Sequence, residues 1–302
     1  MLVYKGTDKD MKCRDFQFEI GKEYEEAEAK LCEKGFHGCE YPLDVFAHYA
    51  PADSRFFEAD LDGVTDEESD DSKRAGTKIK LRAEIGIAGI VKAAVEYIKE
   101  KAESSKNQTG CCSAATNTGN YSAATNTGCC SAATNTGNYS AATNTGCCSA
   151  ATNTGCRSAA TNTGNCSAAT NTGCRSAATN TGNCSAATNT GNYSAATNTG
   201  NYSAATNTGN YSAATNTGNY SAATNTGCRS AATVVGKESI AIVTGVDSKA
   251  SGALGCWLVL TDRGGWNGDT FPIKEVRAVK IDGETIKPGV FYKLENGEVV
   301  EA

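Results

Sequence analysis

Small and polar side chains recur with a strict nine-residue period through the middle of this sequence. The unit G-x-x-S-A-A-T-N-T occurs fourteen times in tandem between positions 110 and 235, the last copy ending in Val-Val, and its second and third positions vary. Because side chains alternate along a strand, Ser and the second Ala would share one face, and the third position, the first Ala and Thr the other. The unit therefore predicts a strand, x-S-A-A-T, and a turn, N-T-G-x, in which Asn and Gly accept positive φ angles.

The residue at the third position indicates how the units stack. Units two apart carry the same residue there in 8 of 12 comparisons, against 3 of 13 for neighbouring units. This pattern predicts a β-solenoid whose coil has 18 residues, although duplication of an 18-residue gene segment would leave the same pattern. Seven regular coils at about 4.8 Å each give a rod of roughly 34 Å. The predicted columns are Cys112, Cys130, Cys148, Cys166, Cys184, Tyr202 and Tyr220 in the odd units, and Tyr121, Tyr139, Arg157, Arg175, Tyr193, Tyr211 and Arg229 in the even units.

The segment before the repeat has ordinary amphipathic patterns. Within residues 1–109, MLVYKG and KIKLRAEIG alternate as strands do, whereas residues 87–103 place their apolar side chains on one face of a helix. The acidic run 60–71 lacks the spacing of a calcium loop, so we interpret it as a solvated loop. We therefore expect residues 1–109 to form a small α+β domain that ends in an amphipathic helix.

The repeat decays toward the C-terminus rather than stopping. Residues 236–253 form two degenerate units that keep Gly, Ser and Ala at the first, fourth and sixth positions. Residues 254–302 hold three strand-like segments and the Asp-Gly and Asn-Gly pairs of tight hairpins, in IDGETI and ENGEVV. We expect the solenoid to span residues 110–253 and a β-rich cap to follow, with Trp257 and Trp266 anchoring its core.

Charged residues are confined almost entirely to the two ends of the chain. The formal net charge is −6, and the three charged side chains within residues 110–235 are all arginines. A nucleic-acid-binding surface needs a basic stripe that neutralises phosphates, so we expect no nucleic-acid partner. We find neither a bilayer-spanning apolar segment nor a signal-peptide pattern, so we expect no membrane partner and a cytoplasmic or virion-associated protein.

Fifteen cysteines are the main candidates for chemistry. Eight fall in odd units, and an 18-residue coil places them along one edge, about 4.8 Å apart, where thiolates can share a soft metal ion or an iron–sulfur cluster. The two thiols of a Cys-Cys pair converge only if the second position lies in the turn. Drift at an outward position and disulfide or redox use stay open, because Tyr, Cys and Arg codons interconvert by single changes and no Cys-x-x-Cys motif occurs. The candidate metal ligands are Cys111, Cys112, Cys129, Cys130, Cys147, Cys148, Cys166 and Cys184.

The globular ends hold both histidines of the chain. His37 lies close to Cys39 in sequence, which leaves a metal-binding or nucleophilic role for His37 and His48 open beside that of packed or surface side chains. We expect the cysteines of the ends to be core residues, namely Cys13, Cys32, Cys39 and Cys256.

Two resemblances bear on function. The repeats resemble those of known β-solenoid families, including the Thr-x-Thr ladders of insect antifreeze and bacterial ice-nucleation proteins. The segments YKG, CRDFQFEIGKEY and GFHGCEYPLDVF resemble an uncharacterised domain that precedes such repeats in bacterial and phage proteins, which implies an architecture rather than an activity. GFHGCEYPLDVFAHY and YKGT are also similar to segments of ADP-ribosyltransferase folds, which would imply transferase activity. Lys5 stands where those folds have His or Arg, and no third catalytic motif is evident.

We therefore expect a mainly β, non-enzymatic protein without a resident cofactor. Its solenoid would be a rigid rod for multivalent binding or self-assembly, and its partner a second copy or another macromolecule. The alternative is a soft-metal or iron–sulfur-binding solenoid that uses the cysteine edge. A lesser alternative is an ice-binding protein that uses its Thr-Asn-Thr ladders.

Overall fold

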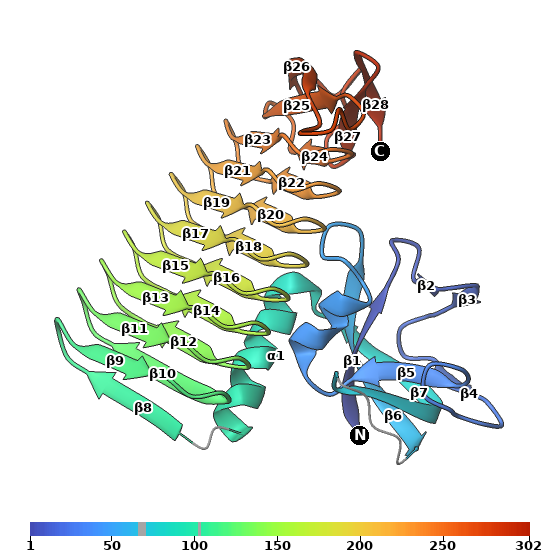
Figure 1. Cartoon of the computed structure of the whole chain (residues 1–302), viewed down its shortest axis with the longest axis vertical. Helices are drawn as coiled ribbons and strands as arrows, with labels where there is room; N and C mark the ends of the chain where they lie inside the picture. The colour runs from blue at the N-terminus through green and yellow to red at the C-terminus, as the bar shows by residue number, and fades with distance from the viewer. Residues whose placement is uncertain (66–70, 102–103) are drawn as a thin grey trace. The chain divides into compact units, whose positions relative to one another are not determined.

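The structure is a computed structural model that describes residues 1–65, 71–101 and 104–302. The chain divides into two compact units, Met1–Glu100 and Lys101–Ala302. The second unit is a β-solenoid of about eight turns with 18-residue coils (Figure 1). The predicted fold class, a mainly β protein with a small α+β region before the solenoid and a β-rich region after it, is confirmed.

Each nonapeptide supplies one short strand, and successive strands alternate between two parallel sheets. Residues 18 apart pair directly, as Thr152 does with Thr170, so the predicted coil length is confirmed. The odd units give β9 (Ala114–Asn117), β11 (Ala132–Asn135), β13 (Ala150–Asn153), β15 (Ala168–Asn171), β17 (Ala186–Asn189), β19 (Ala204–Asn207), β21 (Ala222–Asn225) and β23 (Ile240–Val243). The even units give β10 (Ser122–Thr127), β12 (Ala141–Asn144), β14 (Ala159–Asn162), β16 (Ala177–Asn180), β18 (Ala195–Asn198), β20 (Ala213–Asn216), β22 (Ala231–Val234) and β24 (Lys249–Gly252), after β8 (Ser104–Thr109).

The division of the unit into strand and turn differs from the prediction. The strand is Ala-Ala-Thr-Asn, so Asn ends the strand instead of entering the turn. Asn171 is fully buried, and its Nδ2 donates to Ser158 O at 2.8 Å and to Ala177 O at 3.1 Å. Positive φ falls instead at the third position, as in Cys166 and Arg175, both at 55°. Asn belongs to the strand and not to the turn because its buried amide donates to backbone carbonyls that no other side chain of the unit reaches.

Ser and the second Ala line the interior as predicted, together with Asn. Ser176 Oγ accepts a hydrogen bond from Ser158 N at 3.1 Å and donates to Gly155 O at 3.2 Å. A Cβ atom at Gly173 would lie 2.0 Å from Gly155 O, so the first position requires glycine wherever another nonapeptide glycine lies 18 residues earlier. Backbone ladders and small side chains thus order an interior that holds few large apolar groups.

The two degenerate units form the coil of β23 and β24, where Val243 takes the interior place of Asn. Beyond them β25 (Trp257–Arg263) pairs with β23 and with β26 (Ile273–Lys280), while β27 (Tyr292–Glu295) pairs with β24 and with β28 (Glu298–Glu301). Both sheets therefore continue into the C-terminal region.

Three details of the C-terminal region differ from or extend the sequence interpretation. Asn296 and Gly297 have φ of 51° and 78° and join β27 to β28, so the predicted Asn-Gly hairpin is confirmed. Asp282 joins no hairpin, because its Oδ1 instead accepts from the backbone N–H groups of residues 284 and 286. The prediction that Trp257 and Trp266 anchor the core is wrong, since they are 44% and 59% exposed and the buried side chains there include Leu258 and Leu260.

The N-terminal unit is an antiparallel sheet in the order β4-β7-β5-β1-β6, and β6 also pairs with β7, which closes the sheet on itself. Its strands are β1 (Leu2–Thr7), β4 (Glu23–Glu25), β5 (Phe36–Cys39), β6 (Arg55–Val64) and β7 (Lys73–Glu84). The hairpin of β2 (Lys12–Cys13) and β3 (Phe16–Gln17), the 3-10 helix η1 (Pro42–Ala47) and the helix α1 (Gly86–Lys101) complete it.

Both strands predicted in this unit are present as β1 and β7, and the predicted helix is α1 with Ile90, Val91 and Ile98 buried. Its last predicted residues lie outside the described part. The loop interpretation of the acidic run is wrong for residues 60–64, which belong to β6, because Leu61 is buried and its neighbours pair with β7. Residues 66–70 of that run lie outside the described residues.

Candidate functional site

The turns of the odd units bring the cysteine-rich positions to one edge of the solenoid. Both variable positions lie in the turn that precedes each strand, so the condition for the two thiols of a Cys-Cys pair to converge is met. Cys130 N donates to Cys147 O of the next odd unit at 2.9 Å, which holds successive turns in register. The eight predicted metal ligands are all exposed thiols of this edge: Cys111, Cys112, Cys129, Cys130, Cys147, Cys148, Cys166 and Cys184.

Thiols on neighbouring coils influence one another. Partial desolvation, and then the negative charge of nearby thiolates, raise the pKa of Cys130 and of Cys166. Because the thiolate is the metal ligand, a raised pKa opposes metal binding at neutral pH. Within the part of the chain that the structure describes, no group of three or more His, Cys, Asp or Glu is placed to hold a metal ion.

The aromatic members of the columns stack from coil to coil. In the even units the ring centres of Tyr121 and Tyr139 are 4.8 Å apart with planes 8° from parallel. Arg157 continues that stack, with its guanidinium 5.1 Å from the Tyr139 ring centre and its Nη1 donating to the Tyr139 hydroxyl at 2.6 Å. In the odd units the rings of Tyr202 and Tyr220 are 5.2 Å apart.

Tyr193, Tyr211 and Arg229 behave in the same way. The rings of Tyr193 and Tyr211 lie 5.1 Å apart, and Arg229 stacks on Tyr211 at 5.6 Å and donates to its hydroxyl. Arg175 occupies the same column one coil beyond Arg157. These contacts show that the outward columns are ordered surfaces rather than independent side chains.

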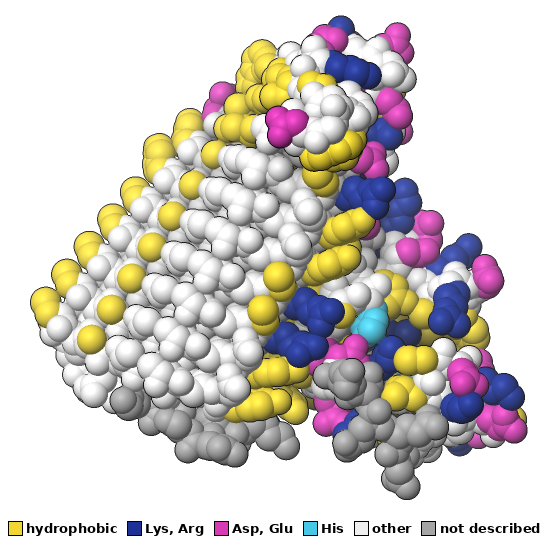
Figure 2. Space-filling view, viewed as in Figure 1, with side chains coloured by type: hydrophobic (Ala, Val, Ile, Leu, Met, Phe, Trp, Pro, Cys, Tyr) yellow, Lys and Arg dark blue, Asp and Glu magenta, His cyan; other side chains and the backbone are white. Residues whose placement is uncertain are grey.

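A shallow groove of about 660 Å³ follows the odd edge. It runs past Cys148, Cys166 and Cys184 and then past Tyr202 and Tyr220, which are 64% and 57% exposed, and Glu238 and Ile240 also line it. Charged side chains are scarce over the solenoid on the face shown in Figure 2. Successive coils therefore present first thiols and then tyrosine rings along this groove.

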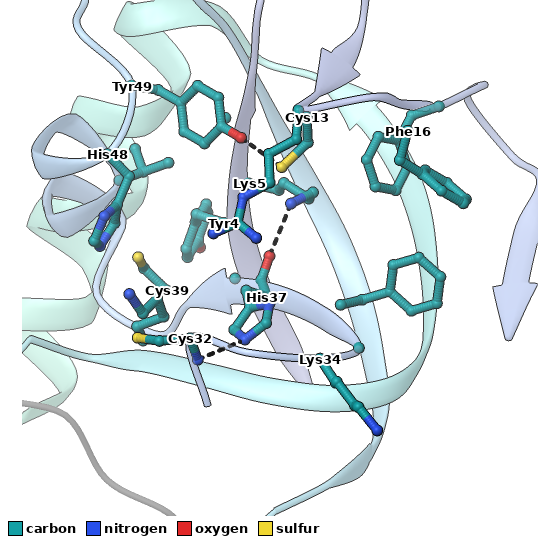
Figure 3. Close-up of a pocket in the computed structure, with 18 of the residues that line it drawn as sticks. Tyr4, Lys5, Cys13, Phe16, Cys32, Lys34, His37, Cys39, His48 and Tyr49 are labelled. Atoms are coloured by element: carbon teal, nitrogen blue, oxygen red, sulfur yellow. Dashed lines mark hydrogen bonds between the residues drawn. The ribbon is translucent and has the colours of Figure 1, made fainter. Parts of the chain in front are cut away.

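A second candidate site is a pocket of about 950 Å³ inside the N-terminal unit (Figure 3). Lys5 on β1 is 4% exposed, and its Nζ donates to His37 O at 3.0 Å. The Tyr49 hydroxyl donates to Cys13 Sγ at 2.7 Å. Cys39 on β5 is buried, and desolvation raises the pKa of its thiol. An amine, two thiols and a phenol thus surround one cavity.

Both histidines line this pocket. His37 Nε2 lies 3.0 Å from Cys32 N and accepts its hydrogen bond, and burial lowers the pKa of His37. His48 Nε2 lies 2.7 Å from Asp71 Oδ2. Both rings therefore have protein partners, so a nucleophilic or metal-binding role for them stays a hypothesis.

The cysteines of the globular ends divide into three kinds. Cys39 and Cys256 are buried, as predicted, and Cys13 is half-buried at the pocket. The prediction of a core residue is wrong for Cys32, which is exposed and has φ of 65°, because it lies in a tight turn before β5.

Two glycines explain how the pocket is assembled. A Cβ atom at Gly6 would lie 2.4 Å from the Tyr49 ring, and one at Gly38 would lie 2.5 Å from Val3 Cγ2. Gly6 lets the Tyr49 ring lie across β1, and Gly38 lets β5 approach β1 closely. Sequence reasoning missed the pocket, and the only signals of it were the glycines of YKG and GFHG beside Lys5 and the histidines.

The solenoid and its ordered columns define the class: a β-solenoid repeat protein. Residues 1–93 match a family described as a domain of unknown function (DUF7666). No curated protein and no solved structure matches the chain. Among the described residues, no helix has the length and apolar character needed to cross a membrane.

Proposed function

We propose that this chain is a non-enzymatic structural repeat protein whose solenoid is a rigid scaffold for multivalent binding or self-assembly. The observation that carries the proposal is the strict pairing of residues 18 apart, which repeats one outward surface along the whole stack. A rigid array of identical groups binds a repetitive partner with high avidity, because after the first contact the others are intramolecular.

The partner proposed is a second copy of the chain, or a virion component if the protein is of the phage type that its sequence resembles. The odd edge favours a copy, since Tyr202 and Tyr220 are exposed beside a groove whose lining includes one charged side chain, Glu238. The outermost strands β8 and β9 each have one neighbour in the sheets, and such strands are templates for further pairing.

Sedimentation velocity over a range of protein concentrations tests self-assembly. We expect the sedimentation coefficient of the wild type to rise with concentration, and this rise to weaken in the double variant Tyr202→Ser/Tyr220→Ser. The matched control is Tyr193→Ser/Tyr211→Ser, which removes an equal stack from the less exposed even column. A wild type that stays monomeric at every concentration would contradict self-assembly.

The soft-metal or iron–sulfur alternative has one observation in its favour. Coils containing Cys111, Cys129 and Cys147 present two thiols each at the same edge. Because desolvation, and then neighbouring thiols, raise the pKa of Cys130, we expect protein purified without oxygen to be colourless and free of bound metal. Metal or sulfide that is retained by the wild type and lost from a Cys112→Ser/Cys130→Ser/Cys148→Ser variant would replace the scaffold proposal with this one.

A further inference from the structure

The lysine in the N-terminal pocket has surroundings unlike those of a surface amine. Its Nζ lies 5.1 Å from the centre of the Phe18 ring and is held by His37 O. The thiols of Cys13 and Cys39 line the same pocket. Among the described residues, no carboxylate forms an ion pair with Lys5. The amine is therefore buried without the counter-charge that normally accompanies a buried ammonium.

This environment favours the neutral, nucleophilic form of the amine. Desolvation lowers the pKa of Lys5, opposed by the nearby thiols of Cys13 and Cys39. The other titratable side chains that line the pocket are Tyr4, Arg14, Asp15, Glu26, Cys32, Glu33, Lys34, His37, His48, Tyr49 and Lys73. A lysine that is desolvated in a pocket is the usual form in which proteins use an amine as a nucleophile toward carbonyl groups.

A proton donor lines the same pocket as the amine. The Tyr49 hydroxyl donates to Cys13 Sγ at 2.7 Å, and Lys5, Cys13 and Tyr49 all line the cavity (Figure 3). Burial raises the pKa of Tyr49, which keeps the phenol protonated at neutral pH. The Tyr49–Cys13 pair can deliver a proton to an oxygen atom that develops in the pocket.

The pocket wall indicates the body of the ligand. Phe16 and Phe18 line the cavity with their ring centres 4.8 Å apart, and Phe36 lies 5.4 Å from Phe16. Flat apolar groups pack favourably against such a wall. The cavity, about 950 Å³, has the size of a small-molecule site.

We propose that this pocket binds a small aldehyde or ketone with a flat apolar body, and that Lys5 captures its carbonyl carbon as an imine. Nζ attacks that carbon, and one N–H proton passes to the carbonyl oxygen to give a carbinolamine. The C–O bond then breaks as the C=N bond forms. Tyr49, through Cys13, donates a proton to the departing oxygen, and the second N–H proton of the amine then reprotonates Tyr49 by the same route. Both amine protons thus leave with the oxygen as water, and no oxidant or reductant is required.

Reductive trapping tests the proposal. The full chain is incubated near neutral pH with benzaldehyde and cyanoborohydride, which reduces an imine to a stable amine, and the modified residues are identified by peptide mass spectrometry. We expect Lys5 to be the main modified lysine, with fragment spectra separating it from the amino terminus. Modification spread over surface lysines, with Lys5 unmodified, would overturn the proposal.

Two Lys→Arg variants and the pH dependence of labelling test the assignment to Lys5 further. Lys5→Arg keeps a long basic side chain but forms no imine, so its pocket labelling should be lost, whereas the exposed Lys80→Arg should label as the wild type does. In the wild type, labelling of Lys5 should persist at pH values at which surface lysines are protonated and no longer react. This pH comparison needs no variant, so it decides the question even if Lys5→Arg fails to fold. Equal labelling of Lys5→Arg and wild type, or identical pH profiles for Lys5 and surface lysines, would contradict the inference.

Discussion

One glycine in each nonapeptide sets how closely two coils approach. The carbonyl of the glycine 18 residues earlier occupies the space of the missing side chain, as Gly164 O does for Gly182. The sequence shows this glycine in every unit, but its role could not be read from the sequence. Glycine is most familiar in turns with positive φ, and here that conformation falls on the variable residue instead.

Gly182→Ala should therefore destabilise the solenoid. Its Cβ would lie 1.9 Å from Gly164 O, and overpacking of this kind costs about 1–3 kcal/mol or more. The thermal unfolding midpoint measures the loss. Gly119→Ala is the matched control, because Gly119 occupies the same position in the first even unit and its Cβ would meet nothing within 4 Å. Equal midpoints for the two variants would refute the close-approach explanation.

At the scale of the strand, the buried Asn determines where each strand of the solenoid ends. Asn prefers turns in general, because its side chain bonds to nearby backbone. In this solenoid the amide bonds across the interior to the preceding unit, as Asn171 does to Ser158 O, so the same residue becomes the last of a strand. Strand pairing was predictable because like residues recur every 18 positions. The strand boundary was not, because it depends on carbonyls brought close only by the fold.

Asn171→Asp should lose roughly 3–5 kcal/mol of stability at neutral pH, because it buries a carboxylate against two carbonyl oxygens. The folded-state pKa of such an Asp lies above its unfolded value of about 3.9. The penalty is therefore full at pH values above the folded pKa and fades as pH falls toward the unfolded pKa. Urea denaturation at several pH values measures this difference from wild type.

Asn192→Asp is the control for that variant. Asn192 is exposed, and its Oδ1 accepts from Asn210 N at 2.9 Å, a role that a carboxylate keeps. Its stability should stay close to that of the wild type at every pH. A loss as large as that of Asn171→Asp would show that the amide's donor role in the interior is unimportant.

At the scale of the whole molecule, the two units differ in how far sequence reasoning reaches. The solenoid is built from contacts 18 residues apart, so its period was enough to predict it. The N-terminal pocket joins Lys5 on β1, Cys13, His37 on β5 and Tyr49, which are distant along the chain. Periodicity carries no information about such contacts, so the pocket emerges only from the closed sheet that brings these segments together.

The solenoid should tolerate the loss of a whole coil. Deleting residues 164–181 lets the remaining strands pair in the same register, since stability in such stacks is approximately a sum over neighbouring repeats. We expect a cooperative unfolding transition with a midpoint near that of the wild type. Deleting residues 164–177 removes a turn and breaks the period, so its far-UV circular dichroism should show lost strand content. Similar spectra and midpoints for both deletions would contradict an 18-residue structural period.

The ladder between coils also fixes how the solenoid yields to tension. Bonds such as Ala177 N to Ser158 O join one coil to the next along the stack, and each coil is held by nearly the same set. A force that pulls the two ends apart loads these sets in series, so coils detach one after another from an end. Each detachment frees 18 residues, or about 60 Å of extended chain at roughly 3.4 Å per residue. The force–extension trace would therefore be a sawtooth of equal steps, and the length of each step would correspond to one 18-residue coil.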